Sequence, residues 1–283
     1  MLGLQKSAEA MSKRWVYDTA TLRDPALEEL FQLWRYRDLL HLLVVNRIKT
    51  RYKRSVLGVV WTLLNPLLNT LVLTIVFSQI FHFDVPNYPI YILSGLLFWN
   101  FFAQSTLDAM DTLVWGSSLL KRIYIPRTIF AVAVVGNGLV NYLLALIPLG
   151  VIMLVLRHPF TLNLAALPLA ILILATFTLG MGLLLSTLAV FFVDLVYIFN
   201  VLLLVWFYLT PIIYPLSILP ERFLPLFRLN PLLHLLQLFR RIIYEGTMPS
   251  LSLWGAAFLL ALVALGIGWI VFTRKADEFA YRI

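Results

Sequence analysis

The chain has 283 residues, of which 61% are hydrophobic and 13% are charged, whereas soluble domains carry roughly 25% charged residues. This composition excludes an ordinary soluble globular protein and predicts an integral membrane protein. Cysteine is absent, which excludes disulfides, thiolate catalysis and cysteine metal sites, and the four histidines lie too far apart in sequence to predict a metal site. The net charge of +8 is distributed in a way that indicates membrane orientation, so no nucleic-acid partner is expected.

The N-terminal segment, residues 1–30, is polar. It carries nine charged side chains and no apolar run, so it does not resemble a cleavable signal peptide. We expect a cytoplasmic N-terminal tail, and we expect the first membrane helix to be an uncleaved anchor.

Residues 31–54 combine apolar and basic side chains. Apolar residues such as Leu33, Leu40 and Val44 recur at helical spacing, and the charged residues mostly fall between them. This pattern predicts an amphipathic helix that lies in the membrane interface, with Trp34 at headgroup depth. A cytoplasmic helix packed on a soluble partner is the alternative.

Residues 55–283 are predicted to form one all-helical membrane domain with six transmembrane helices. A span needs about 20 apolar residues, because each residue adds about 1.5 Å and the hydrocarbon core is about 30 Å thick. The candidate windows are 55–83, 85–107 with room to continue past Asp108 and Asp111, 128–156, 158–193, 195–214, and 246–273, the last beginning after Pro249.

The distribution of Lys and Arg predicts the orientation of these helices. Eleven precede residue 55, three lie in the loop after the second window, and three lie in the C-terminal tail, whereas the opposite side carries only five. Since positive charge concentrates on the cytoplasmic side, both termini are predicted to be cytoplasmic.

The loop 115–127 is predicted to form a small cytoplasmic knob. Ser117 and Ser118 are suited to cap a short helix, and Pro126 ends it. Such a knob suits mechanical contact with a cytoplasmic partner. A plain positive loop is the alternative.

Residues 215–248 are apolar but interrupted by prolines. Two short helices fit, at about 221–228 and 231–244, with Asn230 capping the second and Pro231 in its first turn. Because broken helices at membrane depth must be buried or line a cavity, we expect a re-entrant hairpin at the outer face before the last membrane helix. An ordinary folded outer loop is the alternative.

No nucleotide-binding motif is present, so active transport would take its energy from elsewhere. Asp108, Asp111 and Asp194 are the candidates for ion coupling, although a solvated or locally paired position at the cytoplasmic end of a helix is the favoured interpretation of each. A membrane glycosyltransferase would need clustered acidic residues, and Asp84, Glu221 and Glu245 are scattered.

Aromatic and amide side chains occur together in two of the predicted helices, the first and the fifth. Aromatic faces stack on sugar rings and amides bind sugar hydroxyls, so such helices suit a lumen that passes a glycan. Lipid-facing or packed aromatic residues are the alternative at each position. The candidate lining residues are Trp61, Asn65, Asn69, Asn200, Trp206, Tyr208 and Tyr214.

Several motifs resemble those of the permease subunits of polysaccharide-export ABC transporters, which belong to the type-2 ABC exporter class. The run RYKRSVLG at 51–58 followed by WTLLNP at 61–66 is similar to the entry of their first membrane helix. The run LKRIYIPR at 120–127 resembles their cytoplasmic coupling segment. The runs YLTPIIY at 208–214 and LNP at 229–231 resemble the end of their fifth helix and their outer gate helices.

The resemblance implies a homodimer in the cytoplasmic (inner) membrane, joined to two separate ATPase subunits that bind ATP and Mg, with no catalytic site or cofactor in this chain. It implies export of O-antigen, capsule or teichoic acid chains, often linked to a polyprenyl pyrophosphate lipid, through a channel bordered by the first and fifth helices. A type-2 permease for drugs or lipids, with an apolar and less aromatic lumen, and an ion-coupled secondary carrier are the alternatives.

The resemblance also implies roles for three further sets of residues. Contact with the ATPase is expected from Leu119, Lys121, Arg122, Ile123, Tyr124, Pro126 and Arg127. Binding of the lipid pyrophosphate headgroup is expected from Arg47, Lys49, Arg51, Lys53 and Arg54, with anchoring to anionic lipid as the alternative. The outer gate is expected to include Pro220, Phe223, Asn230, Pro231 and Arg240.

Overall fold

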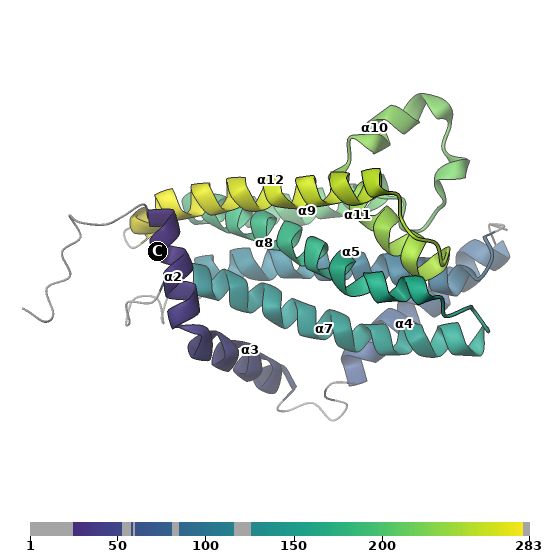
Figure 1. Ribbon diagram of the computed structural model, residues 1–283, viewed down its shortest axis with the longest axis horizontal. Coiled ribbons are helices and arrows are strands. Elements are labelled where there is room, and N and C mark those ends of the chain that lie inside the picture. Colours follow the sequence, from purple (N-terminus) through teal and green to yellow (C-terminus); the bar gives the residue numbers. More distant parts are fainter. Residues whose placement is uncertain (1–24, 53–57, 59, 81–84, 116–125, 280–283) are drawn as a thin grey trace, which may run out of the picture.

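The computed structural model describes residues 25–52, 58, 60–80, 85–115 and 126–279, and every regular element in these ranges is a helix. The long helices run side by side as an elongated bundle (Figure 1). Their bounds are α2 Pro25–Arg35, α3 Arg37–Tyr52, α4 Val60–Thr74 with the π-helix η2 Ile75–Ile80, α5 Tyr88–Trp115, α7 Thr128–Val155, α8 Leu167–Phe191, α9 Asp194–Leu209 and α12 Leu251–Lys275.

Shorter helical pieces fill the two connections at one end of the bundle and close the chain at the other. They are η3 Leu162–Ala166, η4 Leu216–Ile218, η5 Glu221–Phe223, α10 Leu224–Arg228, α11 Pro231–Phe239, the π-helix η6 Arg240–Tyr244 and η7 Ala276–Glu278. The all-helical prediction is confirmed for the described residues.

Four helices are long and apolar enough to cross a membrane: α5, α7, α12, and the continuous stretch of η3 and α8. The apolar parts of α4 with η2 and of α9 are shorter. The protein is therefore a multi-pass membrane protein with four candidate spans among the described residues, and the number of six spans stays a prediction.

The central helix of the bundle is α5, which packs against α4, α7, α8, α9 and α11. It is the least apolar of the four long helices but the most enclosed, with 78% of its most apolar window buried against 28% for α7 and 22% for α12. Two of its buried hydroxyls bond to its own backbone: Thr106 Oγ1 donates to the Phe102 carbonyl at 2.8 Å, and Ser94 Oγ donates to the Tyr91 carbonyl at 3.0 Å. These bonds satisfy polar groups that lipid could not.

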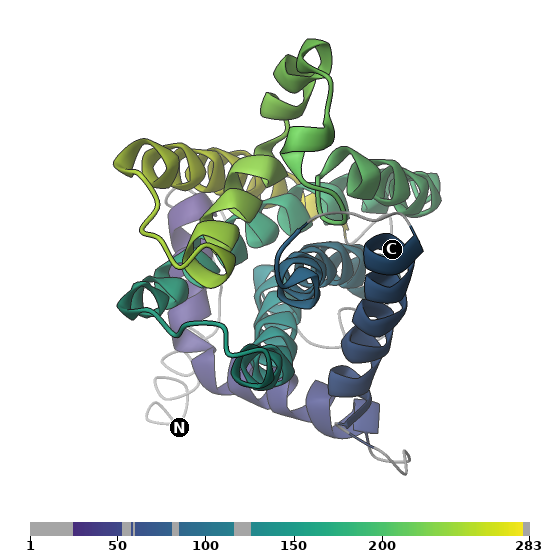
Figure 2. The ribbon, with the colours of Figure 1, turned by 90° about the vertical axis from the view of Figure 1, so that its right-hand side faces the viewer.

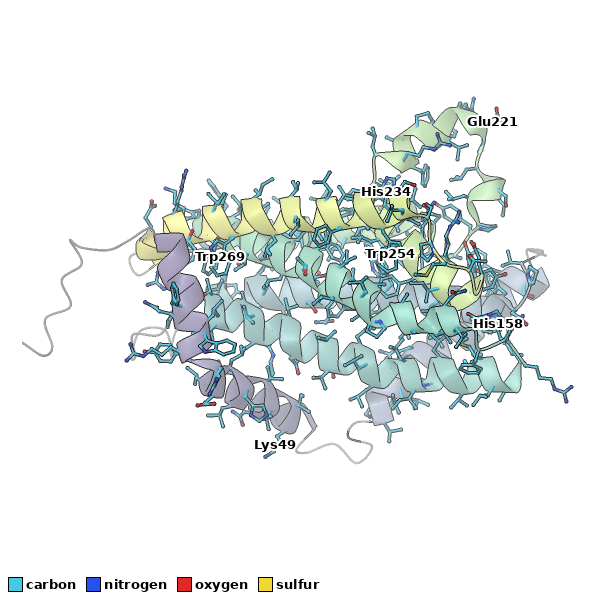
Figure 3. All side chains as sticks on the ribbon, in the orientation of Figure 1. Lys49, His158, Glu221, His234, Trp254 and Trp269 are labelled. Carbon is cyan, nitrogen blue, oxygen red and sulfur yellow. The ribbon has the colours of Figure 1, made fainter. Side chains whose placement is uncertain are left out.

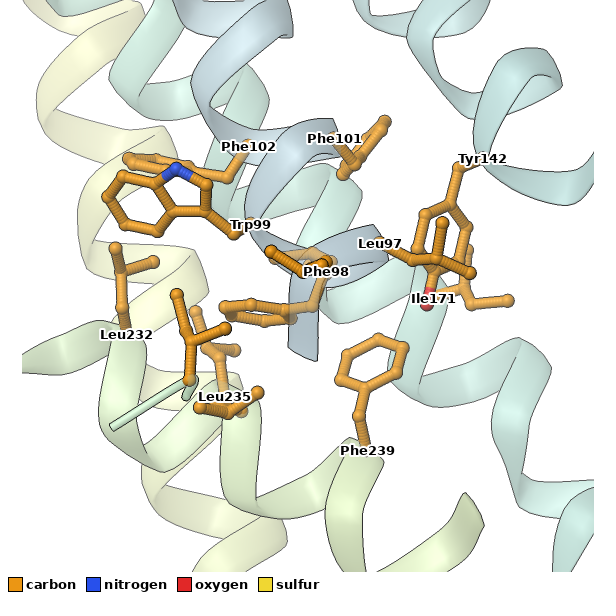
Figure 4. Packing of buried hydrophobic residues seen from close by; sticks show 14 of the residues in the cluster. Leu97, Phe98, Trp99, Phe101, Phe102, Tyr142, Ile171, Leu232, Leu235 and Phe239 are labelled. Carbon is orange, nitrogen blue, oxygen red and sulfur yellow. The ribbon is translucent and has the colours of Figure 1, made fainter. Parts of the chain in front are cut away.

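Aromatic side chains of α5 fill the space between the neighbouring helices. Figure 4 shows Phe98 beside Phe239 of α11, with ring centroids 5.4 Å apart, and Phe101 beside Tyr142 of α7 at 5.6 Å. Trp206 of α9 lies edge-on to Phe102 at 5.5 Å. Edge and tilted contacts of this kind add to the area buried and fix the relative rotation of the helices.

The N-terminal region differs from the single interface helix predicted for residues 31–54. The structure has two helices, α2 and α3, with a turn at Tyr36 between them, and α2 begins at Pro25, inside the predicted tail. The turn allows α2 to cross the end of the bundle while α3 packs along α7 (Figure 1). Thr128 at the start of α7 donates a hydrogen bond to the Glu29 carboxylate of α2. The exposed apolar side chains of the two helices include Phe31, Trp34 and Leu42, which fits an interfacial position.

The predicted window 195–214 extends past the end of the fifth helix, α9, which stops at Leu209. Pro211 disfavours helical geometry at the residue before it, and Thr210 is accordingly extended, with φ −103° and ψ 120°. The polypeptide from 210 to 214 then turns back over α5, where Tyr88 Oη donates to the Ile213 carbonyl at 2.7 Å and Tyr91 Oη donates to the Tyr214 carbonyl at 2.9 Å.

The two short helices predicted within 215–248 are present, the first assembled from η5 and α10 and the second from α11 and η6. Asn230 caps α11 as predicted, and its side-chain oxygen accepts a hydrogen bond from the Leu232 amide at 3.0 Å. The same side chain accepts from Trp206 Nε1 at 2.9 Å and donates to Thr210 Oγ1 at 2.9 Å. Asn230 therefore joins the end of α9 to the start of α11.

The elements that the charge distribution assigned to opposite sides of the membrane lie at opposite ends of the bundle. α2, the start of α7 and the end of α12 meet at one end, where Arg127 lies 5.5 Å from the Phe279 ring. His158 and Glu221 lie at the other end (Figure 3). The side of the membrane that each end faces stays a prediction.

Candidate functional site

A cavity of about 560 Å³ opens between α4, α5 and α7. Its wall contains five amide side chains, two hydroxyls and one indole. We call it the amide cavity. The polar and aromatic residues that line it are Trp61, Asn65 and Asn69 of α4, Asn100, Phe101, Gln104 and Ser105 of α5, and Asn141 and Tyr142 of α7.

Three of the seven predicted channel-lining residues meet in the amide cavity. Asn65 and Asn69 lie one turn apart on α4, and Asn69 Nδ2 donates to Asn65 Oδ1 at 2.9 Å. Trp61 lies one further turn back and is half exposed. The spacing of four residues places all three on one face of α4, because a helix turns once in 3.6 residues.

The other four predicted lining residues lie on α9 or just after it, outside the amide cavity. Asn200 is exposed and donates to the Val196 carbonyl at 2.9 Å, while Trp206 is held by Asn230. Tyr208 is exposed, and Tyr214 Oη donates to its carbonyl. Figure 2 places α4 and α9 along the same side of the bundle. Whether these residues line a channel stays a prediction.

Residues of α5 and α7 complete the cavity, and the sequence interpretation missed them. Asn100 and Gln104 are four residues apart on α5, and the spacing continues to Asp108. Such a polar stripe in an apolar helix is a readable sign of a polar lumen. Asn141 gives the same sign on α7. The sequence interpretation named residues of the first and fifth helices only and therefore left these positions out.

The end of the amide cavity connects to α3 through a hydrogen-bonded ion pair. Gln104 Nε2 donates to Asp108 Oδ1 at 2.9 Å, and Arg47 of α3 lies 3.4 Å from the other Asp108 oxygen. Arg47 also donates to Thr112 Oγ1 at 3.1 Å. Asp108 is thus locally paired, as one of its two interpretations expected. Arg47 is engaged with protein groups, and its binding of a phosphate stays a prediction.

We expect a measurable coupling between Arg47 and Asp108. Replacing Arg47 by Asp, or Asp108 by Arg, brings like charges together, and the double variant that exchanges them restores the pair. Because the two side chains are 37% and 21% exposed, we expect a coupling free energy of about 1 kcal/mol in a double-mutant cycle. The cycle is measured by thermal unfolding of the purified protein in detergent.

The pair Arg37–Asp38 provides the matched control for this cycle. Its charged atoms are 4.0 Å apart and its side chains are 65% and 98% exposed, so solvent screens them and no coupling is expected. Equal coupling energies for the two pairs would contradict a specific role for Arg47 in holding α3 to α5.

The remaining predicted basic and coupling residues are only partly within the described residues. Lys49 lies on α3 and is exposed, and the backbone of Arg51 continues the same helix. Lys53 and Arg54 lie outside the described residues, as do five of the coupling residues, Leu119, Lys121, Arg122, Ile123 and Tyr124. Pro126 is buried and Arg127 contacts Phe279.

The predicted gate residue Arg240 is a buried anchor at the other end of the bundle. It is 6% exposed, its guanidinium lies 3.8 Å from the centre of the Tyr91 ring, and it donates to the Ile212 carbonyl at 3.0 Å. Tyr244 packs edge-on against Tyr91 at 5.2 Å and donates to the Pro86 carbonyl at 2.6 Å. Pro231 starts α11, while Pro220 and Phe223 are exposed on the connection from α9 to α11. A gating movement stays a prediction.

The acidic residues do not assemble a group that could hold a metal ion within the described ranges. Groups of three or more His, Asp or Glu side chains with metal-binding geometry do not occur there. Asp111, Asp194, Glu221 and Glu245 are all exposed, and Asp84 lies outside the described residues.

The comparisons with known proteins agree on one family. The family model described as ABC-2 type transporter matches residues 38–244. The O-antigen export system permease protein RfbA of Myxococcus xanthus is 34% identical over 259 residues, which cover 89% of this chain and 98% of that protein. A protein of the same name from Klebsiella pneumoniae is 29% identical, covering 86% and 95%. The polysialic acid transport protein KpsM of Escherichia coli is 24% identical, covering 83% and 92%.

Proposed function

The chain belongs to the ABC-2 type transporter family of membrane proteins, and from this we infer that it is the permease subunit of an ATP-driven polysaccharide exporter. The resemblance expected from the motifs is confirmed, and the relatives that match nearly along their full length are named as permease and transport proteins for O-antigen and polysialic acid. A permease of this family is not itself an ATPase, so hydrolysis belongs to a partner subunit, which binds ATP and Mg.

The observation that carries the proposal is the amide cavity between three membrane helices. A lumen for drugs or lipids needs few hydrogen-bonding side chains, whereas this wall places five amides, two hydroxyls and an indole among its apolar residues. An ion-coupled carrier is disfavoured because Asp108, the acidic residue nearest the cavity, is held by Arg47 and Gln104. Hydrogen-bonding groups in an otherwise apolar bundle suit a polymer rich in hydroxyls.

The proposed architecture is a homodimer with six spans in each chain, both termini in the cytoplasm and two ATPase subunits below it. α4 and α9 border the channel in this arrangement, with the segment 215–248 as an outer gate. The exposed apolar side chains of both helices support this arrangement, because the single chain leaves them uncovered and a second copy or lipid would cover them. They include Leu68, Leu71 and Val72 of α4 and Val201, Leu204 and Val205 of α9.

The proposed coupling runs from the ATPase through the segment 115–127 and the N-terminal helices to the channel. Closure of the ATPase pair pushes on the end of the bundle that contains α2. At this end α2 is bonded to α7, and Arg47 connects α3 to α5. The basic residues after Arg47, from Lys49 to Arg54, then meet the pyrophosphate of a lipid-linked chain. Repeated cycles of this movement would advance a long polymer through the channel in steps.

The direct test is co-purification with the ATPase encoded beside this chain, followed by an ATPase assay. We expect a stable complex with altered hydrolysis, and we expect the variant with Lys121, Arg122 and Arg127 replaced by Glu to lose both, because the ATPase contact would be reversed in charge. The matched control is Arg157→Glu, an exposed arginine just after α7 at the opposite end. Absence of a complex with any ATPase would overturn the proposal.

A further inference from the structure

The amide cavity offers hydrogen-bonding capacity that the protein does not use. Ser105 and Tyr142 belong to its wall, 2% and 4% of these two residues are exposed, and neither hydroxyl has a hydrogen-bond partner within the described protein. Both oxygens are enclosed in this conformation, and buried hydroxyls without a partner cost free energy, so a ligand whose entry uncovers them and bonds to them is favoured. These two atoms point to a ligand with hydroxyl groups of its own.

The backbone of α7 is shaped to keep this wall open. A Cβ atom at Gly138 would lie 2.2 Å from Ser105 Oγ and 3.3 Å from the Phe101 ring. Glycine at this position therefore lets the Ser105 hydroxyl keep its present orientation, which an alanine would force it to leave. Asn141 and Tyr142 follow on the next turn of α7 and face the cavity with it.

The opposite wall adds an aromatic surface to the amides. Trp61 is half exposed at the cavity, and Asn65 and Asn69 are bonded to each other, which fixes the direction of both amides on α4. A sugar ring is amphipathic. Its apolar face packs against an indole, and its hydroxyls form hydrogen bonds with amides.

The lining of the cavity carries no ionisable Asp, Glu, Lys, Arg or His side chain among the described residues. The nearest ionised network is at its end, where Asp108 and Arg47 neutralise each other at 3.4 Å. A carboxylate brought into the cavity would lose water without gaining a cation, which is unfavourable. An uncharged sugar pays no such penalty.

Resting on the proposed function, we propose that the amide cavity is a subsite for uncharged sugar residues, so that this permease exports a neutral glycan and discriminates against polyanionic ones. The partly exposed amides supply hydrogen bonds, Ser105 and Tyr142 supply the buried contacts, and Trp61 supplies the stacking surface. Charged sugars are then disfavoured, because the wall of the cavity has no compensating charge.

The test compares two polymers in cells that lack their own exporter and that express this chain with its ATPase. One polymer contains only uncharged hexoses, and the other carries a uronic acid in each repeat on the same polyprenyl pyrophosphate carrier. We expect at least tenfold more surface polymer for the neutral chain. Equal export of both would overturn the subsite and leave the proposed function standing. Export of neither, with an intact complex, would overturn the proposed function as well.

Variants locate the effect in the cavity. The double variant Asn100→Leu with Asn141→Leu is expected to reduce export of the neutral polymer about tenfold at unchanged protein level and ATPase binding. Asn100→Ser with Asn141→Ser, which keeps polar groups, should retain more export if the leucine variant does not accumulate. Thr176→Val on α8, outside the cavity, is the matched control. Full export by both cavity variants would overturn the assignment.

Discussion

Replacement of Gly268 by Leu is expected to prevent α12 from docking on α8 and to leave little folded protein. A Cβ atom at Gly268 would lie 2.1 Å from the Gly180 carbonyl oxygen, and one at Gly180 would lie 2.3 Å from the Ala264 carbonyl carbon. Two backbones are in direct contact here, so no side-chain rotation relieves the clash. Small residues at such crossings allow membrane helices to pack closely.

The helices would have to separate to accommodate the leucine, and the contact between α8 and α12 is the most extensive in the bundle. Overpacking of a well-packed core costs typically up to about 3 kcal/mol, and a backbone contact that cannot adjust lies at or above that value. The measurement is the fraction of monodisperse protein after detergent extraction, together with its thermal unfolding temperature. Gly268→Ala should give a smaller loss.

Gly266→Leu is the matched control, because it changes the same residue type on the same helix. No protein atom lies within 4 Å of a Cβ atom at Gly266, and the residue is exposed, so leucine there faces open space. Replacing a helical glycine even favours the helix by up to about 1 kcal/mol. Equal behaviour of the two variants would show that the crossing at Gly268 does not hold the bundle together.

Replacement of Arg240 by Met is the second large effect, and it is expected to release the segment that precedes α11. The guanidinium stacks 3.8 Å from the centre of the Tyr91 ring and bonds to the Ile212 carbonyl at 3.0 Å. A desolvated cation–π contact contributes about 2 kcal/mol, and the orphaned buried carbonyl costs about 1–3 kcal/mol more. Arg240→Lys is not expected to hold the segment either, because lysine lacks the planar group that both stacks on the Tyr91 ring and bonds to the Ile212 carbonyl.

The release of this segment is measured by limited proteolysis of the purified protein. Cleavage within residues 215–230 should be at least tenfold faster in the Arg240→Met variant. Arg241→Met is the matched control, since Arg241 is the next residue of η6 and is exposed. Unchanged proteolysis of the Arg240 variant would show that the tyrosines hold the segment alone, through the hydrogen bonds of Tyr88 and Tyr91 to the Ile213 and Tyr214 carbonyls.

The two anchors act at different places in the proposed transport cycle. Arg240 fixes the segment before α11 to the start of α5, while Arg47 fixes α3 near the other end of α5. α5 also carries Asn100 and Gln104 in the wall of the amide cavity. A single buried helix therefore contacts both ends of the molecule and the cavity between them, which suits it to report a movement at one end to the other.

The sequence by itself determined the class of the protein, most helix positions and the family. Long apolar windows predict helices because lipid leaves the backbone no other hydrogen-bond partners, and α7 spans Thr128–Val155 where the window 128–156 was predicted. The cap at Asn230 was predictable because the hydrogen bond from its side chain is local. The motifs were sufficient for the family because they are contiguous in the chain.

The tertiary structure decided which polar residues meet. The docking of residues 210–214 on α5 and the pairing of Arg47 with Asp108 depend on contacts between segments far apart in sequence. The amide cavity requires three helices at defined rotations, and an apolar helix in a bundle has no strong periodicity from which a rotation can be predicted. The rotation of α5 is set by the packing of Phe98 and Phe102 on other helices, and this packing directs Asn100 and Gln104 into one lumen.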